Sequence, residues 1–204
     1  MKKINFKILI LTSIVCLLPI ILGVYFYNEL PEQVAVHFNI NNEPDNYFSK
    51  QGFVFGIPFM MVAIQIFVCM VSDLSDKNPE ANKKAVSIFK WIIPSITVIL
   101  YIVTLMIALG KVIDIRKIAM MILGMMFIVL GNYTPKTKGM INGMRNLDEK
   151  EYKKIARILG YTFIINGLLC FISIFFNQYV SIAVVVLVVI EAIALYSYKL
   201  LKKK

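Results

Sequence analysis

Residues 88–109 read IFKWIIPSITVILYIVTLMIAL, a run of 22 positions in which Lys90, near the start, is the one charged side chain. About 20 apolar residues carry a helix across the hydrocarbon core of a bilayer, so this run predicts a transmembrane helix. Five further apolar runs accompany it, at residues 8–26, 53–71, 118–133, 158–176 and 179–198, and the run at 118–133 is short. We therefore expect an all-α integral membrane protein with six transmembrane helices.

The basic residues indicate the orientation of these helices. With the N-terminus in the cytoplasm, 18 of the 22 Lys and Arg residues fall in cytoplasmic segments, and the other four are Lys50, Lys111, Arg116 and Lys117. Short cytoplasmic loops carry an excess of Lys and Arg, so we expect both termini in the cytoplasm. The formal net charge of +10 is spread over helix ends, which suits anionic lipid headgroups and argues against direct binding of nucleic acid.

The first outer loop, residues 27–51, is expected to form a short structured element. Val34 and Val36 alternate with Ala35 and His37 as in an extended strand, and Asn41-Asn42 tolerate the left-handed backbone of a tight turn. The loop holds four acidic residues and one lysine, a formal charge of 1 − 4 = −3: Glu29, Glu32, Glu43, Asp45 and Lys50. This charge would attract a cationic amphipathic peptide, and a loop that is merely solvated is the competing interpretation.

The remaining connections differ in length and charge. Residues 72–87 are expected to form a short solvated turn, and residues 134–157 form the longest and most basic inner loop. Within that loop, Asp148 and Glu151 have the spacing of a helix-starting capping box. Only two residues separate the last two apolar runs, which predicts a tight helical hairpin. Three prolines within the runs, Pro19, Pro58 and Pro94, are expected to kink their helices.

Two motifs resemble a known family. The stretch with Leu30-Pro31, His37-Phe38-Asn39 and Pro44-Asp45 is similar to a short domain at the N-terminus of many small bacterial membrane proteins. That domain commonly accompanies SdpI-type immunity proteins. Their second signature is matched by Gly131-Asn132-Tyr133-Thr134-Pro135-Lys136-Thr137-Lys138, followed by Gly143 and Arg145. The chain departs from the family after Arg145, because Tyr152 and Ala156 occupy the places of a usual Trp and His.

The resemblance implies a division into an N-terminal two-helix unit, residues 1–72, and an SdpI-like four-helix region, residues 73–204. It also implies a location in the bacterial cytoplasmic membrane, no enzymatic activity, and immunity to a secreted toxic peptide. In some family members it implies signalling, in which a cytoplasmic transcriptional repressor is captured at the membrane. The candidate residues for ligand or partner contact are His37, Asn39, Glu43 and Asp45 outside, and Asn132, Pro135, Lys136, Lys138 and Arg145 inside.

The candidate residues on both sides also have an interpretation in which they stabilise the protein and bind no ligand. His37 and Asn39 could hydrogen-bond the turn and hold Asp45 in place, and the inner lysines could serve as topology anchors. His37 is the single histidine, and with two carboxylates nearby it does not match a zinc site, so we expect no metal and no cofactor. Cys16, Cys69 and Cys170 lie within apolar runs and are expected to pack as small apolar side chains.

Three strongly polar side chains lie within the expected spans: Gln65, Asn166 and Glu191. A carboxylate at the depth of Glu191 is expected to face the bundle interior, to pair, or to be protonated, and Gln65 and Asn166 are candidate partners. Interhelical hydrogen bonding explains such residues structurally. An ion or proton site at Glu191 would instead indicate a small transporter or proton-coupled channel, which is the competing function.

Overall fold

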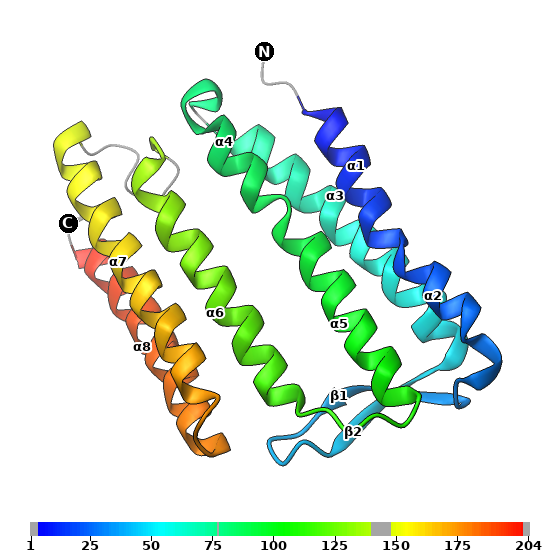
Figure 1. Ribbon diagram of the computed structural model, residues 1–204. Helices are drawn as coiled ribbons and strands as arrows, with labels where there is room; N and C mark the ends of the chain where they lie inside the picture. The colour runs from blue at the N-terminus through cyan, green and yellow to red at the C-terminus, as the bar shows by residue number, and fades with distance from the viewer. Residues whose placement is uncertain (1–3, 77, 140–147, 202–204) are drawn as a thin grey trace. The chain divides into compact units, whose positions relative to one another are not determined.

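The computed structural model describes residues 4–76, 78–139 and 148–201, with side chains described as far as residue 194 (Figure 1). Its helices are α1 Phe6–Leu17, α2 Pro19–Tyr25, α3 Ile57–Ser75, α4 Pro79–Phe89, α5 Ile92–Ala108, α6 Ile115–Tyr133, α7 Glu149–Ser173 and α8 Gln178–Leu201. Its strands are β1 Gln33–Phe38 and β2 Pro44–Ser49. The chain forms two compact units, residues 1–115 and 116–204. The expected boundary at residue 72 rests on the family resemblance and stays a prediction.

Five helical segments among the described residues are long and apolar enough to cross a membrane. They are Phe6–Tyr25, Gly52–Ser75, Pro79–Ala108, Ile115–Lys136 and Glu149–Ser173. The sixth apolar run forms α8, which provides a shorter apolar helix over Gln178–Ala194. The structure thus confirms a mostly helical, multi-pass membrane protein.

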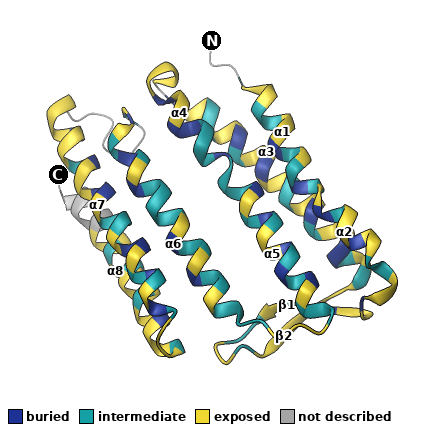
Figure 2. Ribbon diagram, in the orientation of Figure 1, coloured by how far each residue is buried: buried dark blue, intermediate teal, exposed yellow. Residues whose placement is uncertain are grey.

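The distribution of side chains fits a lipid environment. Large apolar side chains such as Ile21 and Phe67, each 67% exposed, cover the outside of the helices, whereas Gln65 and Asn82 are fully buried. Figure 2 shows exposed residues along the outer faces of α1, α2 and α3. In lipid, the apolar surface needs no cover, and polar groups must find partners inside the bundle.

Each proline predicted to kink a helix lies beside an irregularity. α1 ends at Leu17, just before Pro19; a π-helical segment, Gly52–Gly56, precedes Pro58; and the helix breaks between α4 and α5, just before Pro94. Proline lacks an N–H, and its ring clashes with the carbonyl four residues earlier, so a helix cannot continue undisturbed through it. Each proline thus lies beside an interruption of the regular helix, whereas the kinks themselves stay a prediction.

The segment at residues 27–51 contains a β-hairpin that packs against one end of the first unit. Its strands β1 and β2 are antiparallel, with a bulge beside His37. Val34 on β1 is 1% exposed and belongs to one buried cluster with the residue that follows the short 3-10 helix Tyr27–Glu29 and with residues of the π-helical segment and α5. The members of this cluster are Leu30, Val34, Phe53, Val54, Tyr101 and Leu105. Asn42 in the turn has φ of 64°, the left-handed conformation that the sequence predicted. In Figure 1 the hairpin lies at the opposite end of the first unit from the start of α1.

In the second unit, glycines bring α6 and α7 into backbone contact. A Cβ atom at Gly131 would lie 2.6 Å from the carbonyl oxygen of Gly160, and one at Gly124 would lie 2.9 Å from that of Gly167. Only a glycine fits at such distances, and small residues are how helices approach closely in membranes. α7 and α8 then form the tight hairpin that the sequence predicts, with four residues between Ser173 and Gln178.

Of two predictions about the connecting segments, the start of α7 is confirmed and the turn at residues 72–87 is wrong. Asp148 begins α7 as predicted, and its side chain accepts a hydrogen bond of 2.7 Å from the backbone N–H of Glu151. The solvated turn expected at residues 72–87 is wrong. α3 continues to Ser75, α4 begins at Pro79, and Asp76 is only 6% exposed. Polar composition suggested a loop, whereas Pro79 at the first turn of α4 starts a helix whose apolar face packs inward.

Candidate functional site

Asn39 organises the turn of the outer hairpin. Its Oδ1 accepts hydrogen bonds from the backbone N–H groups of Asn41, at 2.9 Å, and Glu43, at 3.0 Å. Its Nδ2 donates to Oε2 of Glu43 at 2.9 Å. An asparagine side chain that bonds the backbone two residues on mimics a turn and stabilises it. Asn39 and Glu43 therefore fix the shape of the turn before any ligand is considered.

His37 and Asp45 close the hairpin just behind this turn. Nδ1 of His37 lies 2.5 Å from Oδ1 of Asp45, and the two side chains are 66% and 41% exposed. The structural interpretation of these residues is thus confirmed, because His37 holds Asp45. Both side chains also remain open to solvent, so a contact with a partner stays a prediction.

The single lysine of the loop, Lys50, is already neutralised. Its Nζ lies 2.9 Å from Oε1 of Glu32 and 5.1 Å from the centre of the Tyr27 ring, and its side chain is 13% exposed. All six residues of β2 are exposed. The carboxylates of Glu43 and Asp45 therefore stand on an open acidic surface, with no lysine partner from this loop and with His37 beside Asp45. We call β2 together with Glu43 the acidic face.

Asn42 ties the tip of the hairpin to the chain before α6. Its Nδ2 donates to the carbonyl oxygen of Ile113 at 3.1 Å, and its Oδ1 accepts from the backbone N–H of Ile115 at 2.8 Å. Ile115 is the first residue of α6. The sequence suggested only that Asn42 would accept a left-handed backbone, because the bonds of its side chain depend on residues more than 70 positions away.

The second motif forms a compact structure at the end of α6. Nζ of Lys136 donates to Oδ1 of Asn132 at 2.9 Å and lies 4.9 Å from the centre of the Tyr133 ring. Pro135 packs on Gly160 of α7, where a Cβ atom would lie 2.6 Å from its ring. These contacts assign packing and turn roles to Asn132 and Pro135.

Two further contacts hold this motif to the start of α7. Tyr152 shares a hydrogen bond of 2.9 Å with Thr137. Lys138 forms a surface ion pair of 3.7 Å with Glu149. The candidate Arg145 lies outside the described residues.

Glu191 pairs with one of its two candidate partners. Nδ2 of Asn166 donates to Oε2 of Glu191 at 2.6 Å, which joins α7 to α8. Asn166 is 2% exposed, and among the described residues its Oδ1 has no hydrogen-bond partner. Gln65 belongs to a different network, in the first unit. The Asn166–Glu191 bond is what interhelical hydrogen bonding predicts.

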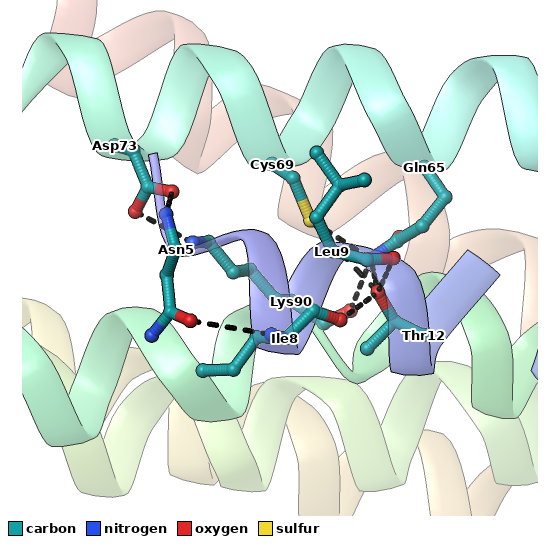
Figure 3. A network of polar contacts seen from close by, with 8 residues as sticks. All are labelled: Asn5, Ile8, Leu9, Thr12, Gln65, Cys69, Asp73 and Lys90. Carbon is teal, nitrogen blue, oxygen red and sulfur yellow. Dashed lines mark hydrogen bonds and ion pairs between the residues drawn. The ribbon is translucent and has the colours of Figure 1, made fainter. Parts of the chain in front are cut away.

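The sequence did not predict a buried polar network between the start of α1, the end of α3 and the break before α5 (Figure 3). Nζ of Lys90 lies 2.6 Å from Oδ1 of Asp73, and the backbone N–H of Asn5 donates to the other oxygen of Asp73 at 2.9 Å. Lys90 was assigned to a cytoplasmic segment, and its side chain is in fact 1% exposed. One feature of the sequence could have indicated this ion pair: Lys90 lies inside an apolar run, 17 residues after Asp73.

Gln65 extends this network toward the middle of α1. Its Nε2 donates to Oγ1 of Thr12 at 2.8 Å and to the carbonyl oxygen of Lys90 at 2.9 Å. Pro94 lacks the N–H that would normally bond the carbonyl four residues earlier, so the carbonyl of Lys90 needs another donor. Gln65 supplies it.

A cavity of about 280 Å³ adjoins the Lys90–Asp73 pair, between the starts of α1 and α4 and the end of α3. Asp76, Glu80 and Lys83 also line it. Among the residues that the structure describes, no group of three or more His, Cys, Asp or Glu side chains could hold a metal ion. The cavity is an opening beside the Lys90–Asp73 ion pair, and its lining also includes the apolar side chains of Ile8, Pro79 and Val86.

Comparison with known proteins gives one match. A family model described as a domain of unknown function (DUF1648) matches residues 14–62, which include the last four residues of α1, all of α2, the hairpin and the start of α3. No curated protein and no solved structure matches. The matched segment is a membrane-type domain, and it contains the whole outer motif from Leu30 to Lys50.

Proposed function

We propose that this protein resides in the bacterial cytoplasmic membrane, binds a secreted cationic amphipathic peptide at its outer hairpin, and so protects the cell from that peptide. The support is the resemblance of both motifs to SdpI-type immunity proteins, together with the chemistry of the hairpin. The domain match covers the hairpin and carries no function of its own. The role proposed is binding and signalling, without enzymatic activity.

The proposed topology has six spans with both termini in the cytoplasm. Its support is the distribution of Lys and Arg, 18 against 4, and the length of α8, which has 24 residues. About 20 residues are enough to span the bilayer core. With this topology, the hairpin faces outward and the Asn132–Lys138 segment faces the cytoplasm.

The observation that carries the proposal is the acidic face. Glu43 and Asp45 are held in place by hydrogen bonds from Asn39 and His37, so a cation meets an ordered surface. Attraction between exposed charges reaches about 8 Å at physiological ionic strength. A cationic peptide arriving along the outer leaflet would therefore be concentrated at the hairpin before it inserts.

On the inner side, we propose that Lys136, Lys138 and Arg145 contact anionic lipid or a cytoplasmic repressor. Lys136 and Lys138 are both exposed. Lys136 is aimed by Asn132, and Pro135 anchors the segment against α7. A basic segment held on a helix end suits an acidic partner surface or lipid phosphates.

A protection assay tests the immunity proposal. The protein is expressed in a peptide-sensitive strain, and survival is measured against a panel of secreted cationic peptides, while relocation of a labelled repressor to the membrane is followed. Survival should rise for at least one peptide. Unchanged survival against all of them, with the protein present in the membrane, would remove the immunity proposal.

A binding assay tests the acidic face directly. A synthetic amphipathic Lys/Leu peptide is titrated against the protein in phosphatidylcholine nanodiscs, with empty nanodiscs as the blank. The double variant Glu43→Gln, Asp45→Asn removes two charges but keeps acceptors for Asn39 and His37. It should bind more weakly, and 1 M salt should weaken binding to the parent protein. Asn41→Ala, an exposed change in the same turn, serves as the control and should bind like the parent.

The second candidate function is a small transporter or proton-coupled channel using Glu191. The observation that favours it is a carboxylate inside the second unit, bonded to Asn166, whose other amide atom lacks a partner among the described residues. Glu191→Gln, which keeps the hydrogen bond and removes the charge, should abolish flux in vesicles if Glu191 carries ions. Absence of flux in the parent protein would end this alternative.

A further inference from the structure

We propose that Asn42 couples the outer hairpin to α6, so that the state of the acidic face controls the first turn of that helix. The part that concerns a ligand rests on the proposed function. The coupling itself rests on the hydrogen bonds between Asn42 and the segment at Ile113 and Ile115.

Asn42 acts on α6 from a distant part of the chain. The first four N–H groups of a helix have no partner within the helix, and that of Ile115 is one of them. Oδ1 of Asn42 accepts it at 2.8 Å, while Nδ2 holds the carbonyl of Ile113 at 3.1 Å. The side chain thus fixes both the entry of the chain into α6 and the helix's first N–H.

The candidate ligand-binding residues of the hairpin hold Asn42 in position. Asn39 bonds the backbone N–H groups on either side of Asn42, at Asn41 and Glu43. The backbone N–H of Asn42 itself donates to the carbonyl of Asn39 at 3.0 Å. Because Glu43 in turn accepts from Nδ2 of Asn39, a cation that takes the Glu43 carboxylate competes with Asn39. The turn then loosens, and Asn42 releases Ile115.

α6 gives this event a route to the inner motif. The helix runs without interruption from Ile115 to Tyr133, 19 residues, and at 1.5 Å per residue its length is about 28 Å. It leads directly into the segment with Asn132, Pro135 and Lys136. Because the helix is continuous, a shift of its first turn that leaves the helix intact is transmitted along it. The hairpin is therefore suited to report peptide binding to the cytoplasmic side.

Hydrogen exchange of the Ile115 amide, measured in nanodiscs, tests whether Asn42 caps the first turn of α6. Asn42→Gly keeps the left-handed turn and removes the side chain, and it should speed exchange at Ile115 by roughly tenfold, as expected for loss of one hydrogen bond. Asn42→Asp keeps the accepting oxygen and the turn, and it should leave the Ile115 amide protected. Asn41→Ala is the control in the same turn. Equal exchange in Asn42→Gly and the parent protein would overturn the proposal.

A second pair of variants tests the link to the acidic face without any peptide. Glu43→Ala removes the acceptor for Asn39 and should speed exchange at Ile115 several-fold, whereas Glu43→Gln keeps the acceptor and should not. If Glu43→Ala leaves the Ile115 amide unchanged, the proposed coupling between the acidic face and α6 is wrong.

The final measurement adds the synthetic Lys/Leu peptide. In the parent protein, peptide binding should speed exchange at Ile115, and in Asn42→Gly it should add little. A peptide that binds the hairpin without changing this amide in the parent protein would overturn the coupling. A peptide series that never binds would instead remove the proposed function, while the Glu43 variants still decide the coupling.

Discussion

The Nζ of Lys90 lies 2.6 Å from the Oδ1 of Asp73, and the two side chains are 1% and 11% exposed. Two buried charges are stable only when they meet each other and further polar partners. Here the backbone N–H of Asn5 donates a hydrogen bond to the other carboxylate oxygen of Asp73. The pair therefore joins the start of α1, the end of α3 and the break before α5.

Loss of one partner from this pair should destabilise the protein strongly. Lys90→Met leaves the Asp73 carboxylate buried without its cation, and we expect the free energy of unfolding to fall by about 3–5 kcal/mol. Unfolding in mixed detergent micelles measures the change. The double variant Lys90→Met, Asp73→Leu should recover most of the loss, because no buried charge remains. Lys153→Ala, which breaks the exposed pair with Glu149, is the control and should have no measurable effect.

Substitution of the contact glycines should separate α6 from α7. In Gly131→Ala the new methyl group would lie 2.6 Å from the carbonyl oxygen of Gly160, and such overpacking is worth about 1–3 kcal/mol of destabilisation. The matched control is Gly56→Ala, because nothing lies within 4 Å of that position. The control should unfold like the parent or at slightly higher denaturant. Equal stability of the two variants would contradict the close helix contact.

Cysteine labelling should place the hairpin and the start of α7 on opposite sides of the membrane. The three native cysteines are buried, so an impermeant maleimide should not reach them. Asn41→Cys should react in intact cells, whereas Lys154→Cys and Lys204→Cys should react only after permeabilisation. Reaction of Asn41→Cys and Lys154→Cys from the same side would contradict the proposed topology, and reaction of Lys204→Cys from outside would contradict the sixth span.

Local sequence was enough to predict the apolar helices, the hairpin turn and the start of α7, but not α4. Hydropathy over about 20 residues determines a span, the left-handed preference of asparagine determines the turn at Asn42, and Asp148 caps its own helix. Each of these depends on residues close together in the chain. The contacts His37–Asp45 and Asn166–Glu191 could also be predicted from the sequence, because few other polar partners were available to these residues.

The long-range contacts could not be predicted from the sequence alone. In the sequence, Asp73 lies in a segment with the composition of a solvated loop, and Lys90 resembles a topology anchor. Only the packing of α1, α3 and α5 brings the two residues together with Asn5. Likewise, Asn42 meets Ile113 and Ile115 because the hairpin folds back over the end of α5. Periodicity shows which residues share a helix face, but it does not show which helix lies opposite.

The bond between Gln65 and the carbonyl of Lys90 leads to a prediction in which one substitution compensates another. Gln65→Leu should lower the free energy of unfolding by about 1–2 kcal/mol. The buried carbonyl of Lys90 then has no hydrogen-bond donor, because Pro94 has no N–H to take the place of Gln65. Pro94→Ala supplies a backbone N–H four residues after Lys90, in the position of an ordinary helical bond. Its effect should therefore depend on whether Gln65 is present.

In the parent protein, Pro94→Ala offers a second donor to a carbonyl that is already satisfied, so the gain should be small. In the Gln65→Leu background, the same change should restore most of the lost stability. Unfolding of the four proteins in mixed micelles gives the coupling free energy, expected to be at least about 0.5 kcal/mol in favour of the double variant. Strictly additive effects would mean that Gln65 does not serve the carbonyl that Pro94 leaves open, and the break between α4 and α5 would then need another explanation.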